Sequence, residues 1–164
     1  MRNIAPICAQ WRISCSKTCV TDLRGVTVIT TFREGTPHGM TASSFSSLSL
    51  EPPLVLVSVD QRARLHQLLP ETGRYGVSIL AKGQDLLSTH FAGRPSDSLQ
   101  IPWIEAEGLP FLDGAVAHLA CDVFEAVPGG DHIIYVGRIT HAQAWSDREP
   151  LLYHCGKYCT LRVA

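Results

Sequence analysis

A long β-hairpin, predicted near the C-terminal end, is the sequence feature that most constrains the fold. Residues 115–127 and 132–145 are both typical of β-strands, and Pro128, Gly129 and Gly130 stand between them. These three residue types form tight turns, so we expect the two segments to pair as one long antiparallel hairpin. A doubly wound parallel sheet would instead need a helix between most of its strands.

Shorter strand-like segments surround this hairpin. Residues 25–31 (GVTVITT) are β-branched nearly throughout, and residues 54–59 (LVLVSV) form a second clear strand pattern. Further strands are expected at 75–80 and around 151–161. Directly after the strand at 25–31, a hairpin turn is expected within residues 32–38, where Gly, Thr and Pro follow one another.

After residue 23, only two segments predict helices. Residues 62–69 carry an apolar stripe, which we expect Pro70 to stop, and residues 84–92 carry a second stripe that ends at Gly93. Many strands with two short helices predict a mainly β chain. We expect a closed antiparallel β-barrel with short helical insertions, because closure removes exposed sheet edges.

The amino-acid composition narrows the domain organisation and the partners. The 164 residues carry 14 Lys plus Arg against 15 Asp plus Glu, so a nucleic-acid partner is not expected. No apolar run approaches the roughly 20 residues of a membrane span, and we expect a cytoplasmic protein with its six cysteines reduced. Residues 1–23 lack a clear periodicity, so we expect an arm or short helix there, followed by one domain over residues 24–164.

A run of small and hydroxylated residues is the first candidate site. Such side chains let a flat ligand approach the backbone, while N–H and O–H groups bind carbonyls, hydroxyls or phosphate. A polar loop without function is the alternative. The run comprises Thr41, Ala42, Ser43, Ser44, Ser46, Ser47 and Ser49.

The turn Gly129-Gly130-Asp131-His132 is a second candidate, because it puts His132 at the rim of the barrel, where it can bind a phosphate or a nucleotide carboxamide. On composition alone, a hairpin turn with an incidental His is the simpler reading. Two further groups are also candidates. The aromatic group has a plain alternative as part of the core, and the arginine pair has one as a solvated helix face. They are Phe91, Tyr153 and Tyr158 for a planar ligand, and Arg62 and Arg64 for a phosphate.

The cysteines do not predict a metal site. His154, Cys15-x3-Cys19 and Cys155-x3-Cys159 supply ligand types for zinc. If residues 155–159 form a strand, however, Cys155 and Cys159 lie on the order of 13 Å apart. The sequence also lacks a G-x-S-x-G elbow, a Walker loop and a G-x-G-x-x-G loop.

Taken together, the motifs resemble the flavin reductase-like family. These are short-chain, FMN-binding split-barrel reductases that serve two-component flavin monooxygenases. The resemblance covers residues 24–161, although CSKTCVTDLRGV departs from the family's N-terminal helix, which bears an Arg and a Phe. The motifs are GVTVITT, HGMTASSFSSLSLEPPLVLVSVD, STHFAGR, GDHIIYVGRI and PLLYHCGKY, in this order.

The resemblance implies a homodimer of antiparallel Greek-key split barrels with flavin near the subunit interface. It implies hydride transfer from nicotinamide C4 to flavin N5, with no catalytic side chain. The implied flavin contacts are Met40, Thr41, Ala42, Ser43 and Ser44 to the ring and ribityl chain, Ser47, Ser49, Ser58, Val59, Asp60 and Arg64 to the tail and phosphate, and Phe91 beside the flavin. The implied nicotinamide contacts are His132 with Asp131, and Tyr153 and Tyr158.

The implied function is NAD(P)H-dependent reduction of free FMN or FAD, with the reduced flavin passed to a monooxygenase partner. The sequence leaves open FMN or FAD, and NADH or NADPH. It also leaves open three alternatives: an electron carrier with tightly bound FMN, a non-catalytic flavin- or haem-binding module, and a zinc protein. Haem ligands would come from His118, His141 or Cys121.

Overall fold

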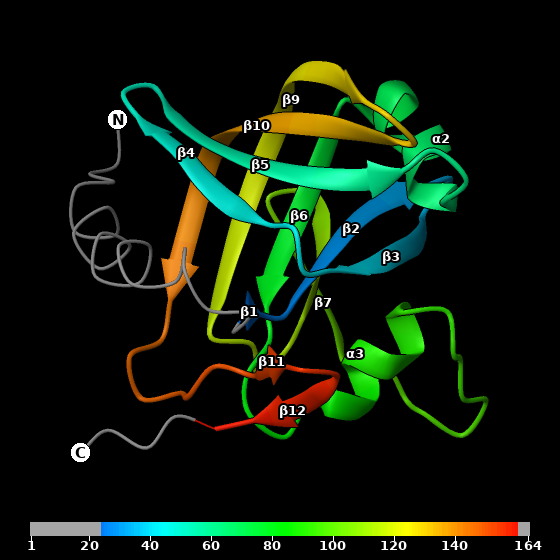
Figure 1. Ribbon diagram of the computed structural model, residues 1–164, viewed down its shortest axis with the longest axis vertical. Coiled ribbons are helices and arrows are strands. Elements are labelled where there is room, and N and C mark those ends of the chain that lie inside the picture. Colours follow the sequence, from blue (N-terminus) through cyan, green and yellow to red (C-terminus); the bar gives the residue numbers. More distant parts are fainter. Residues whose placement is uncertain (1–23, 161–164) are drawn as a thin grey trace.

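A computed structural model describes residues 24–160, and its centre is one curled antiparallel sheet (Figure 1). The strand order is β3-β2-β6-β9-β10-β5-β4. The edge strands β3 and β4 follow one another along the chain but do not pair, so within the described residues the expected closed barrel is open between them, as in a split barrel. The bounds are β2 Thr27–Arg33, β3 Thr36–Ala42, β4 Ser46–Leu50, β5 Pro53–Asp60, β6 Arg74–Ile79, β9 Ala117–Gly129 and β10 His132–Ala144.

The core lies inside this curled sheet. Side chains alternate between the two faces of a strand, and in β5 the buried positions Val55, Val57 and Val59 face inward. Ile29 of β2, Val77 of β6 and Leu119 of β9 join the same apolar cluster. The prediction of a mainly β fold with two short helices is therefore confirmed.

The long hairpin is confirmed as the pair β9–β10, in which His132 lies opposite Gly129. The expected turn at residues 128–130 is displaced, however. Pro128 and Gly129 still pair with β10, and the turn is made by Gly130 and Asp131. Gly130 has a φ of 73°, which a glycine adopts without steric penalty.

The first helix, α2 (Arg64–Thr72), passes through the proline that was expected to stop it. Pro70 lacks the N–H that would reach the carbonyl of His66 four residues earlier. The hydroxyl of Tyr135 donates to that carbonyl instead, at 3.3 Å. The helix ends at Gly73, whose φ is 65° and whose N–H donates to the Leu69 carbonyl.

The second helix, α3 (Asp85–Phe91), lies at the opposite end of the molecule from α2, beside a small sheet (Figure 1). That sheet has the order β1-β11-β12, with β1 Arg24–Gly25, β11 Leu152–His154 and β12 Lys157–Cys159. The single strand expected around 151–161 is thus two short strands, joined by a turn at Cys155 and Gly156.

Two further differences concern turns and a hairpin. The first hairpin turn lies at Glu34 and Gly35, so β3 begins already at Thr36. The hairpin of β7 (Trp103–Ala106) and β8 (Leu109–Leu112) was not expected from the sequence. Within residues 24–160, no helix is long and apolar enough to cross a membrane. The expected arm at residues 1–23 lies outside the described residues.

Candidate functional site

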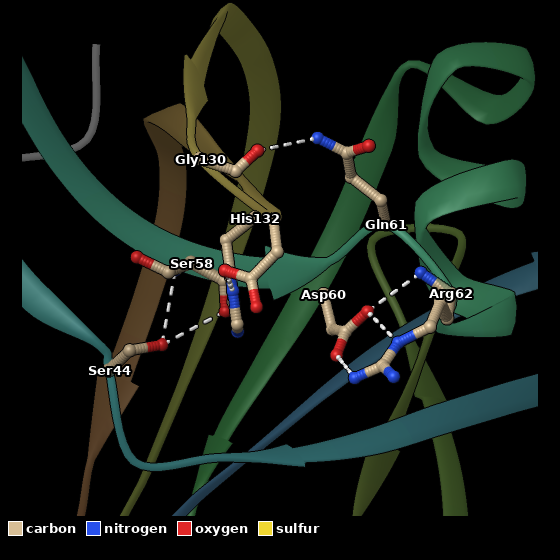
Figure 2. Close-up of polar contacts among 8 residues, drawn as sticks. Ser44, Ser58, Asp60, Gln61, Arg62, Gly130 and His132 are labelled. Atoms are coloured by element: carbon tan, nitrogen blue, oxygen red, sulfur yellow. Dashed lines mark hydrogen bonds and ion pairs between the residues drawn. The ribbon is translucent and has the colours of Figure 1, made fainter.

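The site begins where β4 stops pairing with β5. Regular pairing reaches Ser46 opposite Leu56, and the side chain of Ser44 then takes over. Its hydroxyl donates to the Ser58 carbonyl at 3.0 Å and accepts the Ser58 N–H at 3.1 Å (Figure 2). Ser44 thereby fixes the segment between β3 and β4 against the end of β5.

His132 faces the same end of β5. It lies directly opposite Asp60 in the β5–β10 ladder, so both side chains project from one face of the sheet, as does Ser58. Its Nδ1 lies 2.8 Å from Asp131 Oδ1. The structure therefore brings together Ser44, Ser58, Asp60, Asp131 and His132 (Figure 2).

The turn that carries His132 is held in place by Gln61. The Gln61 N–H donates to the Asp131 carbonyl at 3.1 Å, and its Nε2 donates to the Gly130 carbonyl at 3.0 Å. A glycine turn has many accessible conformations, and these two bonds select one. His132 is thus presented on a fixed turn.

Asp60 is paired with the guanidinium of Arg62. Arg62 Nε and Nη2 lie 3.1 and 2.7 Å from the two carboxylate oxygens, and the Arg62 N–H donates to Oδ1 at 2.8 Å. Hydrogen bonds from Arg62, and the charges of Arg62 and His132, hold the pKa of Asp60 well below its usual range. The pKa of Asp131 is also lowered, chiefly by its hydrogen bond to His132. The rim of the site therefore carries two ionised carboxylates at neutral pH.

The side chains of the predicted flavin segment do not all face one way. Met40 and Ala42 pack against the central core, while Thr41 points to the other face, where its Oγ1 donates to the Ser88 carbonyl at 2.7 Å. Ser43 is exposed. A ligand along this segment would meet Thr41 and Ser43 by their side chains, and Ala42 by its backbone.

Phe91 lies against the same strand. An ideal Cβ on Gly39 would lie 2.8 Å from Phe91 Cε1, so only glycine lets α3 pack this closely on β3. The Phe91 ring also meets the Trp103 ring edge-to-face, with centroids 5.6 Å apart. Phe91 is thus half-buried and fixed beside the flavin segment.

The two predicted tyrosines pair with each other at the small sheet. Tyr153 and Tyr158 are cross-strand neighbours in β11 and β12, with ring centroids 5.3 Å apart. The Tyr158 hydroxyl donates to Ser88 Oγ at 3.0 Å. These rings therefore belong to the α3 side of the site, with Thr41 and Phe91.

Four other predicted residues are placed differently. Ser49 pairs with Leu54, six residues before Asp60, which puts it about 20 Å along β5 from His132. Ser47 lies between, on the same edge strand. Val59 is fully buried in the core, so it offers a ligand only its backbone, and Arg64 is exposed at the start of α2.

The geometry around the C-terminal cysteines differs from the single strand assumed above. Cys155 sits in the turn of the β11–β12 hairpin, with its Sγ 3.2 Å from His154 Nε2, while Cys159 pairs with Leu152. Among residues 24–160, no three His, Cys, Asp or Glu side chains form a group suited to a metal ion. Cys15 and Cys19 lie outside the described residues.

Comparison with known proteins identifies the family. Residues 23–162 match the family model described as the flavin reductase like domain. The chain belongs to the flavin reductase-like family. This confirms the resemblance inferred from the motifs.

Individual members of the family are similar over nearly the whole chain. An NADH-dependent flavin reductase from Rhodococcus sp is 44% identical over 143 residues, covering 85% of this chain and 80% of that protein. A 4-hydroxyphenylacetate 3-monooxygenase reductase component from Thermus thermophilus is 42% identical over 129 residues, covering 79% and 83%. The solved structure of flavin reductase PheA2 in its native state has a TM-score of 0.82 at 35% identity, covering 96% and 98%.

The residues of this flavin reductase-like site fit a flavin. The small, exposed Ser43 leaves the backbone beside it open to a planar ring, and Phe91, which packs on Gly39, supplies an aromatic neighbour. The exposed Ser43 hydroxyl and Arg64 guanidinium are donors suited to a ribityl chain and a phosphate.

Two of the three candidate haem ligands do not fit a porphyrin. His118 packs between the rings of Phe111 and Trp145, at centroid distances of 4.8 and 4.9 Å. Cys121 is fully buried in the core. His141 Nδ1 lies 3.6 Å from a Glu107 carboxylate oxygen. Neither His118 nor Cys121 has an open side on which a porphyrin could lie.

Two residues of the site were missed by sequence reasoning. Gln61 had no signal, because its role depends on a turn that lies 69 residues away. Ser88 did have one. It stands beside Leu87 on the buried side of α3, and a serine at such a position indicates a buried hydrogen bond.

Proposed function

We propose that the chain is an NADH-dependent flavin reductase that delivers reduced flavin to a monooxygenase. The observation that carries the proposal is the convergence of Ser44, Ser58, Asp60 and His132 at one end of β5 in a member of this family. The relatives named as an NADH-dependent flavin reductase and as a monooxygenase reductase component support the hydride donor and the partner.

The bound nicotinamide and flavin supply the redox chemistry, a hydride transfer from C4 to N5. The task of this chain is to hold the two rings in register and to exclude water. Met40, Thr41, Ala42, Ser43 and Ser44 bind the flavin ring and ribityl chain, and Phe91 covers it. Ser58 and Arg64, with the backbone of Val59, hold the tail and phosphate, and Ser47 and Ser49 contribute farther along β4. The ionised Asp60 accepts hydrogen bonds from hydroxyl groups of the tail.

His132 is the proposed anchor of the nicotinamide. In the neutral imidazole, Asp131 Oδ1 accepts a hydrogen bond from Nδ1–H, which leaves Nε2 as an acceptor. The amide N–H of a nicotinamide carboxamide is a suitable donor to that nitrogen. Tyr153 and Tyr158 lie on the α3 side, away from His132, and would meet the nicotinamide from that side.

The working form is proposed to be a cytoplasmic homodimer. Leu48 and Leu50 on the edge strand β4 are 50% and 44% exposed, and exposed apolar side chains on a sheet edge are commonly covered by another chain. A second copy placed there would also bring Ser47 and Ser49 of β4 close to a subunit interface.

The test is NADH and NADPH oxidation by the purified protein, with and without FMN or FAD at several concentrations. Saturable turnover with NADH that depends on free flavin is expected. Turnover that needs no added flavin, with flavin retained through gel filtration, would favour the electron carrier. Absence of flavin binding would contradict the proposal altogether.

A further inference from the structure

Ser88 joins two parts of the site that belong to different sheets. Its backbone carbonyl accepts the hydroxyl of Thr41 from β3 at 2.7 Å, and its own hydroxyl accepts that of Tyr158 from β12 at 3.0 Å. Ser88 itself is only 2% exposed, so both part-buried hydrogen bonds are shielded from water at their Ser88 end. One residue of α3 thus connects the flavin segment with the C-terminal hairpin.

The C-terminal hairpin needs such an anchor. Its strands β11 and β12 have three residues each, and its other neighbour, β1, has two. Strands this short are not stable by themselves in water. On the α3 side, Thr89 Oγ1 lies 3.3 Å from the Tyr158 hydroxyl, which adds a weaker second contact.

The helix that provides the anchor is itself fixed on β3. The absence of a Cβ at Gly39 lets the Phe91 ring lie against the strand, and the Thr41–Ser88 bond ties the same strand to the preceding turn of α3. A displacement of α3 would therefore move both the flavin segment and Tyr158. The three elements form one rigid support.

We propose that Ser88 is a positioning residue, which sets the tyrosine pair of the C-terminal hairpin relative to the flavin segment. The inference rests on the proposed function, because it concerns how that site is assembled. Removing the Ser88 hydroxyl leaves Tyr158 with only the weaker contact to Thr89, so the hairpin is held less firmly beside α3 and β3. Tyr158 acts through Ser88, and its hydroxyl is not itself a ligand contact.

A double-mutant cycle distinguishes two possible roles of the Tyr158 hydroxyl, positioning through Ser88 and direct contact with the nicotinamide. If the hydroxyl acts through Ser88, then Ser88→Ala, Tyr158→Phe and the double variant remove the same interaction, and their effects are not additive. If the hydroxyl contacts the nicotinamide, Tyr158→Phe raises the KM for NADH and Ser88→Ala does not. Ser98→Ala is the matched control, because Ser98 lies on the exposed loop after α3 and bonds only to Ser96 among the described residues.

The experiment measures flavin dissociation constants by fluorescence quenching, steady-state KM and kcat for flavin and NADH, and urea unfolding of each variant. We expect Ser88→Ala and Tyr158→Phe each to weaken flavin binding by about three- to tenfold, and the double variant no further. Ser98→Ala should match the wild type.

Three results would overturn the assignment. They are a Ser88→Ala variant whose flavin binding equals that of the wild type, additive losses in the double variant, and losses of urea stability without any change in flavin binding. A wild-type protein that neither binds flavin nor oxidises NADH would overturn the proposed function as well. A wild type that reduces flavin normally, with any of the three results above, would overturn only the role of Ser88.

Discussion

The hydroxyl of Tyr135 donates to the carbonyl of His66, the acceptor that Pro70 leaves without a backbone partner. The same hydroxyl lies 2.8 Å from His66 Nδ1. A buried residue of β10 thereby compensates for a proline inside α2. This contact explains why the helix continues to Thr72, and it makes the helix depend on a side chain far away in the sequence.

Tyr135→Phe is therefore expected to destabilise the protein. The change leaves the His66 carbonyl without a donor, which costs about 1–3 kcal/mol of unfolding free energy. Urea denaturation measures this loss. Tyr153→Phe is the control, because Tyr153 is exposed and its change should alter the stability by less than about 0.5 kcal/mol. Equal stabilities of Tyr135→Phe and the wild type would contradict the role assigned to the hydroxyl.

Gly137 is required by the ring of Tyr75. A Cβ on Gly137 would collide with the Tyr75 hydroxyl, which is buried beside Cys121. Gly137→Ala is expected to lower the unfolding free energy by about 1–3 kcal/mol, as overpacking does. Adding Tyr75→Phe removes the hydroxyl, the closer of the two colliding Tyr75 atoms, and should restore part of the loss. If the double variant is no more stable than Gly137→Ala, the collision is not the cause.

The buried His118 predicts a loss of stability in mild acid. Burial is the largest effect on its pKa and lowers it, with the nearby charge of Arg148 acting in the same direction. The unfolded chain binds this proton near pH 6.5, whereas the folded chain binds it only at lower pH. Stability from this group is therefore complete above about pH 6.5 and declines as the pH falls through the lowered pKa.

The measurement compares thermal midpoints at pH 7.5 and 5.5 for the wild type and for His118→Gln. Glutamine keeps a donor for the Leu112 carbonyl and has no titrating proton. The drop in midpoint between the two pH values should shrink in the variant. His38, whose pKa is also lowered by burial, contributes to the remaining drop. An unchanged drop would exclude His118 as a source.

Local patterns predicted the fold well where strands are long. The β9–β10 hairpin and β5 carry enough β-branched residues and turn residues to be recognised from sequence alone. The end of α2 was misjudged because Pro70 is rescued by Tyr135, a contact that no local window contains. The β7–β8 hairpin was missed because its strands have only four residues each.

The site was predicted in part, for a related reason. Family motifs identified Ser44, Ser58 and His132, which the structure brings together through strand pairing. Side-chain direction was not predicted, because an expected strand does not tell which of Met40 and Thr41 faces the core until its partners are known. Ser88 and Gln61 act across long sequence separations, so only the folded structure reveals them.

His132→Ala is expected to weaken the binding of NADH more than the binding of flavin. Loss of the acceptor Nε2 removes one hydrogen bond to the nicotinamide, which should raise the KM for NADH by about tenfold. The KM for flavin should change by less than about twofold. Steady-state kinetics with each substrate varied in turn measures both values. Equal increases for the two substrates would contradict the assignment of His132 to the nicotinamide.

Gly39→Ala tests the packing of α3 on the flavin segment. The added Cβ would lie 2.8 and 2.9 Å from two atoms of the Phe91 ring and 3.3 Å from Val28 Cγ1, so Phe91 must move. Because Phe91 ends α3, this displacement should reach Ser88 and weaken flavin binding by about tenfold or more. Gly25→Ala is the control, since no atom of residues 24–160 lies within 4 Å of its Cβ. Flavin binding by Gly39→Ala that matches Gly25→Ala would show that the close approach of Phe91 to β3 is not needed for the site.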